Sequence, residues 1–260
     1  MKTGSLSVVG TGIRSVGQLT IESIACMRNA EKMFYGVSDP IAESLILRLN
    51  PSAESLQKYY VDGKSRLQTY KDMVDHILES VRNGNRTCAA FYGHPGVFVL
   101  PSHEAIRQAR SEGYEARMLP GISAEDCLFA DLGVDPANSG CQSYEATDFV
   151  MHQRKLDPSC SVIIWQIAVT GHWIFQEAGY SNSGLPLLLE KLSGYYRPDH
   201  RVFVYEAAVF PGCEPVIRPV MLGQLPEVPL TSASTLYIPP AHAAIPDRNM
   251  WLRLRLPINF

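Results

Sequence analysis

The feature that most constrains the fold is an alternation of short apolar runs with helix-patterned segments. Apolar runs at residues 6–10 and 33–37 have the length of buried strands, and each is followed by apolar residues at helical spacing. A strand–helix–strand order predicts a mostly parallel, doubly wound sheet with helices on both faces. The chain has 260 residues, 46% of them hydrophobic, so it can bury the core that such a sheet needs.

The same order continues through the first half. The clearest helix is expected over 65–81, where apolar residues recur every three or four positions between the N-cap Ser65 and Asn83-Gly84. Further elements are expected as a strand at 87–92, a helix near 102–111, a strand at 115–119 and a helix that Ser123 opens.

The second half has a different pattern. Strands are expected at 162–167, 202–206 and 235–238, with a helix at 185–196. Prolines at 211, 215, 219, 226 and 229 indicate edge strands and turns. We therefore predict two α/β domains, residues 1–122 and 123–240, followed by a tail at 241–260.

Charge and cysteine content exclude several classes of protein. The formal net charge is −3, from 23 basic and 26 acidic residues, which argues against a nucleic-acid binder. The chain shows neither a signal peptide nor an apolar run long enough for a membrane span, so we expect a cytoplasmic protein. Its six cysteines are widely spaced without CxxC, which predicts free thiols, and the absence of metal-ligand spacing predicts no metal.

Three glycine-containing loops follow strands expected in the first half. Gly10-Thr11-Gly12 is half of a dinucleotide fingerprint, but Ser15 stands where the third glycine belongs. Tyr92–Phe98 contains two glycines around His-Pro, and Pro120–Asp126 places a glycine turn before a helix. Each loop alone is compatible with a simple turn. Two such loops at successive strand ends favour a small-molecule site at the carboxyl edge of the sheet.

Arg66 and Tyr70 are four residues apart on the expected 65–81 helix and so share a face. Tyr60 precedes the Asp62-Gly63 turn and could fold back towards them. A guanidinium next to a phenol lowers the phenol pKa, which suits proton abstraction from a very weak acid or stabilisation of the anion. In the alternative interpretation, Tyr70 belongs to the core and Arg66 forms a salt bridge with Asp62.

Four segments carry a resemblance to a known family: Gly10–Gly12, Tyr92–Phe98, Pro120–Leu132 and Gln142–Phe149. Together they resemble the borosin peptide α-N-methyltransferases, a branch of the tetrapyrrole methylase superfamily (class III methyltransferases). The similarity extends from about residue 4 to Pro240. It implies a tetrapyrrole-methylase-like fold, with two α/β domains and the cofactor cleft between them.

The resemblance implies repeated methyl transfer from S-adenosylmethionine to backbone amide nitrogens of a ribosomally made peptide, with S-adenosylhomocysteine as the second product. Amide resonance withholds the nitrogen lone pair, so the amide must be activated. By resemblance, Arg66 and Tyr70 activate it, with Tyr60 and Tyr92 assisting. The implied cofactor contacts are Gly10, Tyr92, His94, Val97, Phe98, Ser123, Ala124, Gln166, Ala207, Ser234 and Thr235.

The resemblance also implies partners. They are a precursor peptide with leader and core, a second copy of the chain in a homodimer, and in the larger assembly a heterotetramer with two precursor chains. The residues from Asn249 to Phe260 lack the small apolar run of a core peptide, so we expect the split type, which acts on a separate precursor. The alternative is a truncated form of a fused protein. One departure is Gln57, where family members often carry a tyrosine.

Two other functions are compatible with parts of the pattern. One is a tetrapyrrole C-methyltransferase, which has no evident need of an Arg66–Tyr70 pair. The other is a non-catalytic module that binds cofactor or peptide.

Overall fold

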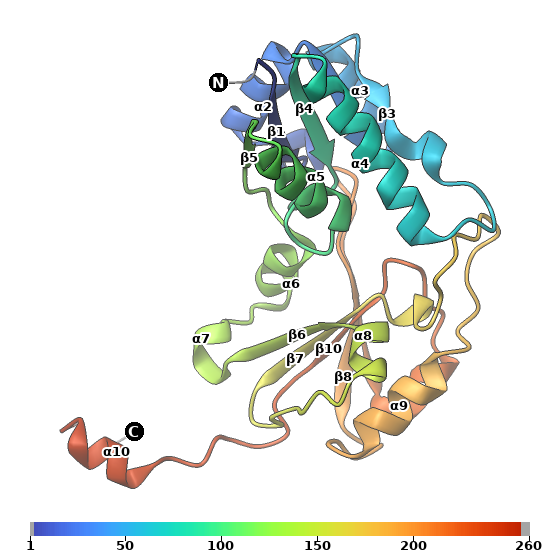
Figure 1. Ribbon diagram of the computed structural model, residues 1–260. Helices are drawn as coiled ribbons and strands as arrows, with labels where there is room; N and C mark the ends of the chain where they lie inside the picture. Colours follow the sequence, from blue (N-terminus) through green and yellow to red (C-terminus); the bar gives the residue numbers. More distant parts are fainter. Residues whose placement is uncertain (1–2, 256–260) are drawn as a thin grey trace. The chain divides into compact units, whose positions relative to one another are not determined.

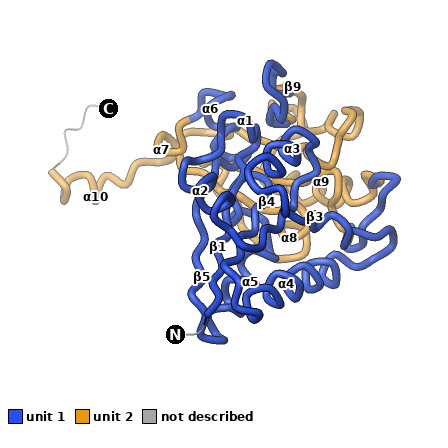
Figure 2. The backbone as a smooth tube through the Cα atoms, turned by 90° about the horizontal axis from the view of Figure 1, so that it is seen from above, with its two compact units in different colours: residues 1–134, 172–180, 206–216 blue, residues 135–171, 181–205, 217–260 orange. Residues whose placement is uncertain are grey.

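The computed structural model describes residues 3–255, which form two compact units (Figures 1 and 2). Unit 1 comprises Met1–Val134, His172–Tyr180 and Glu206–Val216, and unit 2 comprises Asp135–Gly171, Ser181–Tyr205 and Ile217–Phe260. This division lies one helix beyond the boundary expected at residue 122, because α6 (Ala124–Leu132) groups with unit 1. Two later segments also return to unit 1, which no local sequence pattern indicated.

Unit 1 contains a five-stranded sheet in the order β3-β2-β4-β1-β5. Its strands are β1 (Ser5–Gly10), β2 (Lys32–Gly36), β3 (Glu54–Ser55), β4 (Arg86–Phe91) and β5 (Glu115–Met118). Every neighbouring pair is parallel. The mostly parallel sheet predicted for this half is therefore confirmed.

Helices cover both faces of this sheet. On one face, α4 (Arg66–Arg82) and α5 (Leu100–Ser111) pack on alternate strand residues such as Leu6 and Val8 of β1. On the other face, α2 (Ile21–Asn29) and α3 (Pro40–Leu49) pack with residues such as Val9. This alternation follows from the two-residue period of a strand, and it produces two apolar layers.

The connections create a topological switch point at the carboxyl edge of the sheet. β1 leads through the short α1 (Ser15–Gln18) to α2 on one face, whereas β4 leads to α5 on the other. β1 and β4 are neighbours, so the chain leaves adjacent carboxyl ends in opposite directions. Open α/β sheets bind ligands at such switch points.

Unit 2 contains a second five-stranded sheet, in the order β6-β7-β10-β8-β9. Its strands are β6 (Cys141–Glu145), β7 (Ser161–Trp165), β8 (Arg201–Glu206), β9 (Val216–Met221) and β10 (Thr235–Ile238). β10 runs antiparallel to β7 and β8, whereas β6 and β7 are parallel. Pro219 lies in β9 at the sheet edge, as the proline pattern predicts.

Helices α8 (Ala146–Met151) and α9 (Leu185–Ser193) contribute Phe149 and Leu188 to the core on one face of this sheet. The remaining helices are α7 (Pro136–Ser139) and α10 (Arg248–Arg253). β6 was not predicted, because its residues CQSYE lack an apolar alternation. Residues 256–260 of the expected tail lie outside the described residues. Between residues 3 and 255, no helix is both long and apolar enough to cross a membrane.

Candidate functional site

Three loops of unit 1 meet at the carboxyl edge of its sheet, and they meet through glycines. The amide of Gly12 donates to the Gly93 carbonyl at 3.2 Å, and the Gly93 amide donates to the Gly12 carbonyl at 3.0 Å. A Cβ on Gly10 would lie 2.3 Å from the Gly93 oxygen, and one on Gly121 would lie 2.7 Å from the same atom. Close packing of backbones therefore requires these glycines.

Gln18 fixes the first of these loops. Its side-chain oxygen accepts from the amides of Ile13 and Arg14, both at 2.8 Å. Its amide group points to the sulfur of Cys127 on α6, 3.7 Å away. The Gly10–Gly12 loop is thus tied to α6, the helix that follows Ser123, through Gln18, a residue that no sequence motif singled out.

Hydrogen bonds within the Tyr92–Phe98 loop hold it in a turn. The Gly96 amide donates to His94 Nδ1 at 2.8 Å, so a neutral His94 ring carries its proton on Nε2. The Val97 amide closes the turn on the His94 carbonyl at 3.1 Å. Phe98 follows with φ 56°, a left-handed backbone, and its side chain is 53% exposed. The turn therefore leaves the Phe98 ring exposed in the loop that follows β4.

Tyr92 begins this loop and is partly exposed. Burial of its phenol, with smaller contributions from the neighbouring Cys127 and Asp39, raises its pKa to about 12. Tyr92 is therefore protonated at neutral pH. Its electrostatic neighbours are Cys127 and Asp39 rather than Arg66, with which the sequence analysis grouped it.

Ser123 forms a capping box at the start of α6. Its hydroxyl accepts from the Asp126 amide at 3.2 Å, while the Asp126 carboxylate accepts from the Ser123 amide at 2.7 Å. The Ser123 hydroxyl also donates to that carboxylate at 2.7 Å. Ala124, the first residue of α6, is half-buried beside it. The third loop thus ends in an ordered helix N-terminus.

The start of α4 is held by a segment more than a hundred residues away. The amides of Gly63 and Arg66 donate to the carbonyls of Phe175 and Trp173 at 2.9 and 3.1 Å, and the Phe175 amide donates to the Lys64 carbonyl at 2.9 Å. The Tyr60 ring packs on Phe175, with centroids 5.2 Å apart. Residues 172–180 therefore form a wall beside the Arg66 end of α4.

Tyr60, Arg66 and Tyr70 come together as expected, and Tyr180 joins them. The Arg66 guanidinium lies 5.2 Å from the centre of the Tyr180 ring. Asp62 instead accepts from the Glu177 amide at 3.0 Å. Throughout residues 3–255 no salt bridge to Arg66 is found, so the Arg66–Asp62 alternative is wrong.

The electrostatics of Tyr60 correct one expectation. Burial raises the pKa of Tyr60 well above its usual value, and the charge of Tyr70 and a hydrogen bond to it act in the same direction. Arg66 lowers that pKa, but by less. Because desolvation outweighs the guanidinium, Tyr60 stays protonated and is suited to donate a hydrogen bond rather than to remove a proton.

Tyr70 is half-buried and packs against the α4–α5 core layer. α4 precedes β4 through a short turn and runs antiparallel to it, so its first turn lies towards the carboxyl edge. Seventeen helical residues span about 25 Å, against about 20 Å for the six residues of β4. Arg66 therefore projects past the end of its neighbouring strand.

The remaining predicted contacts lie at the ends of β7, β8 and β10, although Ala207 itself groups with unit 1. Gln166 follows β7 with φ 59° and is exposed among buried neighbours. The Ile167 amide donates to the Ser234 carbonyl at 3.2 Å, which places Gln166 beside Ser234 and Thr235. Ala207 directly follows β8, whose Tyr205 pairs with Thr235. The strand expected to reach 167 ends at Trp165, because Gln166 is left-handed.

A cavity of about 630 Å³ in unit 1 was not anticipated. It lies between α1, α6 and residues 208–215, and its charged groups are Arg14, Asp126, Asp131 and Glu214. Three acids against one base make it net negative. Asp126 is also the capping partner of Ser123, so this cavity borders the third loop.

Comparisons with known proteins agree with this architecture. A family model described as Tetrapyrrole (Corrin/Porphyrin) Methylases matches residues 5–221, so the chain belongs to that family. The structure is similar to uroporphyrin-III-C-methyltransferase from Thermus thermophilus, with a TM-score of 0.66, 16% identity and coverage of 99% and 98% of the two chains. A cobalt precorrin-4 methyltransferase gives a TM-score of 0.64 at 14% identity, covering 90% of this chain and 94% of the other. These likenesses confirm the predicted fold class.

Curated relatives are named as methyltransferase and peptide precursor together. The chain is 48% identical over 243 residues to the methyltransferase/ribosomally synthesized cyclic peptide dendrothelin A precursor of Dendrothele bispora, covering 92% of this chain and 58% of that protein. It is 46% identical to the gymnopeptides precursor of Gymnopus fusipes, covering 98% and 62%. It is 41% identical to a type I borosin cyclic peptide precursor of Coprinopsis marcescibilis, covering 92% and 63%. The chain thus spans about three-fifths of these relatives.

Proposed function

We propose that this chain transfers methyl groups from S-adenosylmethionine to backbone amide nitrogens of a ribosomally made peptide, repeatedly along its core. Membership of the tetrapyrrole methylase family supports methyl transfer. The names of the relatives, which combine a methyltransferase with a cyclic peptide precursor, support a peptide substrate. The fold alone does not distinguish a peptide from a porphyrinogen.

The observation that carries the proposal is the group at the start of α4. Arg66 has the Tyr180 ring on one side and Tyr60 and Tyr70 nearby, but no carboxylate partner among residues 3–255. A guanidinium that lies among phenols without a counter-ion is suited to stabilise an anion that forms only during the reaction.

Residues at the carboxyl edge of the unit 1 sheet fit the cofactor. Val97 and the exposed Phe98 ring offer apolar walls for a flat base. Among the described residues, the buried hydroxyls of Ser15 and Ser102, which follow β1 and β4, have no hydrogen-bond partner. We propose that the cofactor is held by Gly10, Tyr92, His94, Val97, Phe98, Ser123 and Ala124, together with Gln166, Ala207, Ser234 and Thr235. When bound, it supplies an electrophilic methyl group on a sulfonium.

The chain's own residues then activate the amide. A phenol with a raised pKa is a hydrogen-bond donor at neutral pH, so Tyr60 donates to the peptide carbonyl oxygen, where negative charge collects once the amide proton is lost. Arg66 stabilises the same charge, Tyr70 orients the Tyr60 hydroxyl through their hydrogen bond, and the amide proton passes to solvent water. The protonated Tyr92 positions the substrate from the Tyr92–Phe98 loop. Donors placed in advance are the largest single source of such stabilisation.

Substitution of Arg66 and Tyr70 tests this chemistry. We expect Arg66→Ala and Tyr70→Phe each to lower turnover by about a hundredfold or more while cofactor binding, measured by calorimetry, is retained. The matched control is Arg82→Ala, at the other end of α4, where an exposed ion pair with Glu112 makes a small contribution to stability. Unchanged turnover in both site variants would contradict the proposal and favour a non-catalytic binding module.

The substrate is tested separately. Purified precursor peptides with leader and core are incubated with the protein and S-adenosylmethionine, and the products are fragmented by mass spectrometry. We expect mass increments of whole methyl groups located on the backbone. Methylation of a porphyrinogen with an unchanged peptide would instead indicate a tetrapyrrole C-methyltransferase.

Action on a separate precursor, a homodimer or heterotetramer, and a cytoplasmic location stay predictions. The same incubation tests the first of these, because methylation of an added peptide requires action in trans. Size-exclusion chromatography with light scattering tests the assembly.

A further inference from the structure

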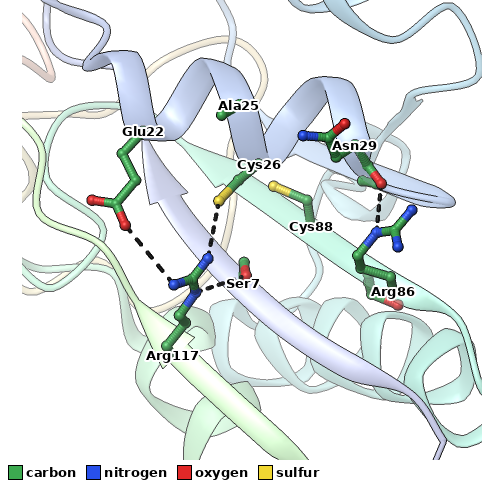
Figure 3. Close-up of a pocket in the computed structure, with 10 residues that line it drawn as sticks. Ser7, Glu22, Ala25, Cys26, Asn29, Arg86, Cys88 and Arg117 are labelled. Atoms are coloured by element: carbon green, nitrogen blue, oxygen red, sulfur yellow. Dashed lines mark hydrogen bonds and ion pairs between the residues drawn. The ribbon is translucent and has the colours of Figure 1, made fainter.

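A cavity of about 430 Å³ lies on the α2 face of the unit 1 sheet (Figure 3). Cys88, Ser7 and Arg117 occupy adjacent positions on β4, β1 and β5 and form its floor. Glu22, Cys26 and Asn29 of α2 line it from above. Ser7 and Cys88 are the third of six residues in parallel strands whose carboxyl ends carry two of the glycine loops, and the cavity shares no lining residue with those loops. The cavity is therefore distinct from the proposed methyl-transfer site.

Two thiols face this cavity and differ in accessibility. Cys88 is 1% exposed, and its sulfur points towards Cys26 (Figure 3). Burial raises the pKa of Cys88 far above the usual thiol range, and Cys26 adds to the effect. Cys26 is only half-buried, and Arg117 donates to its sulfur at 3.6 Å. A thiolate formed at Cys26 would therefore have a cation beside it.

The charged side chains around the cavity are incompletely paired and can bind a charged ligand. Arg117 makes only long contacts, 3.4 Å to the Ser7 hydroxyl and 3.9 Å to Glu22, and is half exposed. At the opposite end (Figure 3), Arg86 donates through Nε to the Asn29 carbonyl at 2.6 Å, and its amide donates to Glu31. Within the described chain its two Nη groups have no acceptor. Two guanidinium groups and the Glu22 carboxylate thus remain available.

We propose that this cavity binds a tripeptide thiol of the glutathione class and that Cys26 forms a mixed disulfide with it. The ligand carries two carboxylates, which match Arg117 and Arg86, and one ammonium group, which matches Glu22. In the reaction, the Cys26 thiolate attacks one sulfur of the oxidised, disulfide form. A Cys26–sulfur bond forms, the ligand disulfide breaks, and one ligand thiolate leaves.

Burial of the Cys88 thiol explains why a mixed disulfide at Cys26 is the end product. A second thiolate next to the adduct would displace the ligand and close a Cys26–Cys88 disulfide. Cys88 stays protonated because it is buried, and a protonated thiol is a poor nucleophile. The adduct at Cys26 therefore persists until an external thiol removes it.

The first test is incubation of the full chain with oxidised glutathione, followed by intact mass measurement and peptide mapping. The Cys213→Ser background removes the exposed thiol of unit 1 that is most open to non-specific reaction. We expect one glutathionyl group, located on Cys26 and lost in Cys26→Ser. Labelling spread over other cysteines, or a Cys26–Cys88 disulfide without an adduct, would overturn the proposal.

The second test separates recognition from thiol reactivity. Rates are compared for oxidised glutathione and for uncharged 2-hydroxyethyl disulfide in Arg117→Gln and Arg86→Gln. Loss of one charge-assisted hydrogen bond in Arg86→Gln predicts a rate about tenfold lower with glutathione only. Arg117 also contacts the Cys26 sulfur, so Arg117→Gln should slow both reactions, and the one with glutathione about tenfold more. Arg28→Gln, an exposed arginine on α2 with the same change of charge, is the control and should react as the parent.

An equal fall with both disulfides would show that the arginines act on the sulfur alone, and the binding site would be wrong. S-methylglutathione, which cannot exchange, gives an independent readout. It should protect Cys26 from alkylation by iodoacetamide, whereas protection that is the same in Arg86→Gln and Arg117→Gln would also contradict the site.

Discussion

Gly10 lies where three loops of unit 1 meet, and the absence of a side chain allows them to meet. An added Cβ would lie 2.3 Å from the Gly93 oxygen and 3.1 Å from the Gly121 Cα, both backbone atoms that cannot move aside. We therefore expect Gly10→Ala to lower the free energy of unfolding by about 3 kcal/mol, measured by urea denaturation. Gly194→Ala is the control. Its φ is −72° and its nearest neighbour is 3.5 Å away, so the change should stay within about 1 kcal/mol.

Burial of the Tyr196 hydroxyl without a hydrogen-bond partner lowers the stability of the folded state. Tyr196 is 3% exposed, and in the part of the chain that the structure describes its hydroxyl has no hydrogen-bond partner. Burial, with smaller contributions from Cys160 and Asp157, raises its pKa from 10 to about 12. The folded state holds the proton more tightly, so this contribution to stability is complete below pH 10 and is lost as the pH rises to 12.

We therefore expect Tyr196→Phe to be as stable as the parent at pH 7, or more stable by up to about 1 kcal/mol. Its free energy of unfolding should fall less steeply than that of the parent between pH 10 and 12. Denaturant titrations at several pH values measure both. Parallel pH profiles would show that Tyr196 does not titrate in this way.

At the scale of elements, the starts of α6 and α4 look alike in sequence and differ in structure. Both have serine at the N-cap, but only Ser123 makes side-chain capping bonds, whereas Ser65 makes none and bridges to Ile174 through its backbone. Ser123→Ala should therefore lower the free energy of unfolding by about 1 kcal/mol. Ser65→Ala should change it by less than half of that. Equal losses of stability in the two variants, measured by thermal or urea denaturation, would mean that the capping bonds of Ser123 add nothing to what the uncapped Ser65 contributes.

At the scale of the whole molecule, the chain leaves unit 1 and returns to it twice. The returning residues 172–180 accept hydrogen bonds from Gly63 and Arg66, and the Arg66 amide is one that a helix start normally leaves without a partner. We therefore expect both amides to exchange slowly with solvent. Phe175→Pro removes the donor to the Lys64 carbonyl and should speed their exchange, while Ala89 in β4 stays protected. Unchanged exchange at Gly63 and Arg66 would contradict the docking of this segment.

Local patterns in the sequence were enough for most elements of unit 1, although not for the two-residue strand β3, and for much of the candidate site. Apolar runs located its main strands, and the four-residue spacing of Arg66 and Tyr70 placed them on one helix face, because both signals depend on neighbours along the chain. The same reasoning missed β6, whose residues are polar, and Tyr180, whose position depends on backbone contacts with residues 62–66.

Three features depend on the tertiary structure and could not be predicted from the sequence. The tertiary structure brought residues 172–180 to α4, it made burial outweigh the charge of Arg66 at Tyr60, and it placed Cys26 beside Cys88 and Arg117. Each depends on which distant groups share a low-dielectric environment or a hydrogen bond. The sequence by itself determined the fold class and the types of residue available for chemistry, because these follow from periodicity and composition.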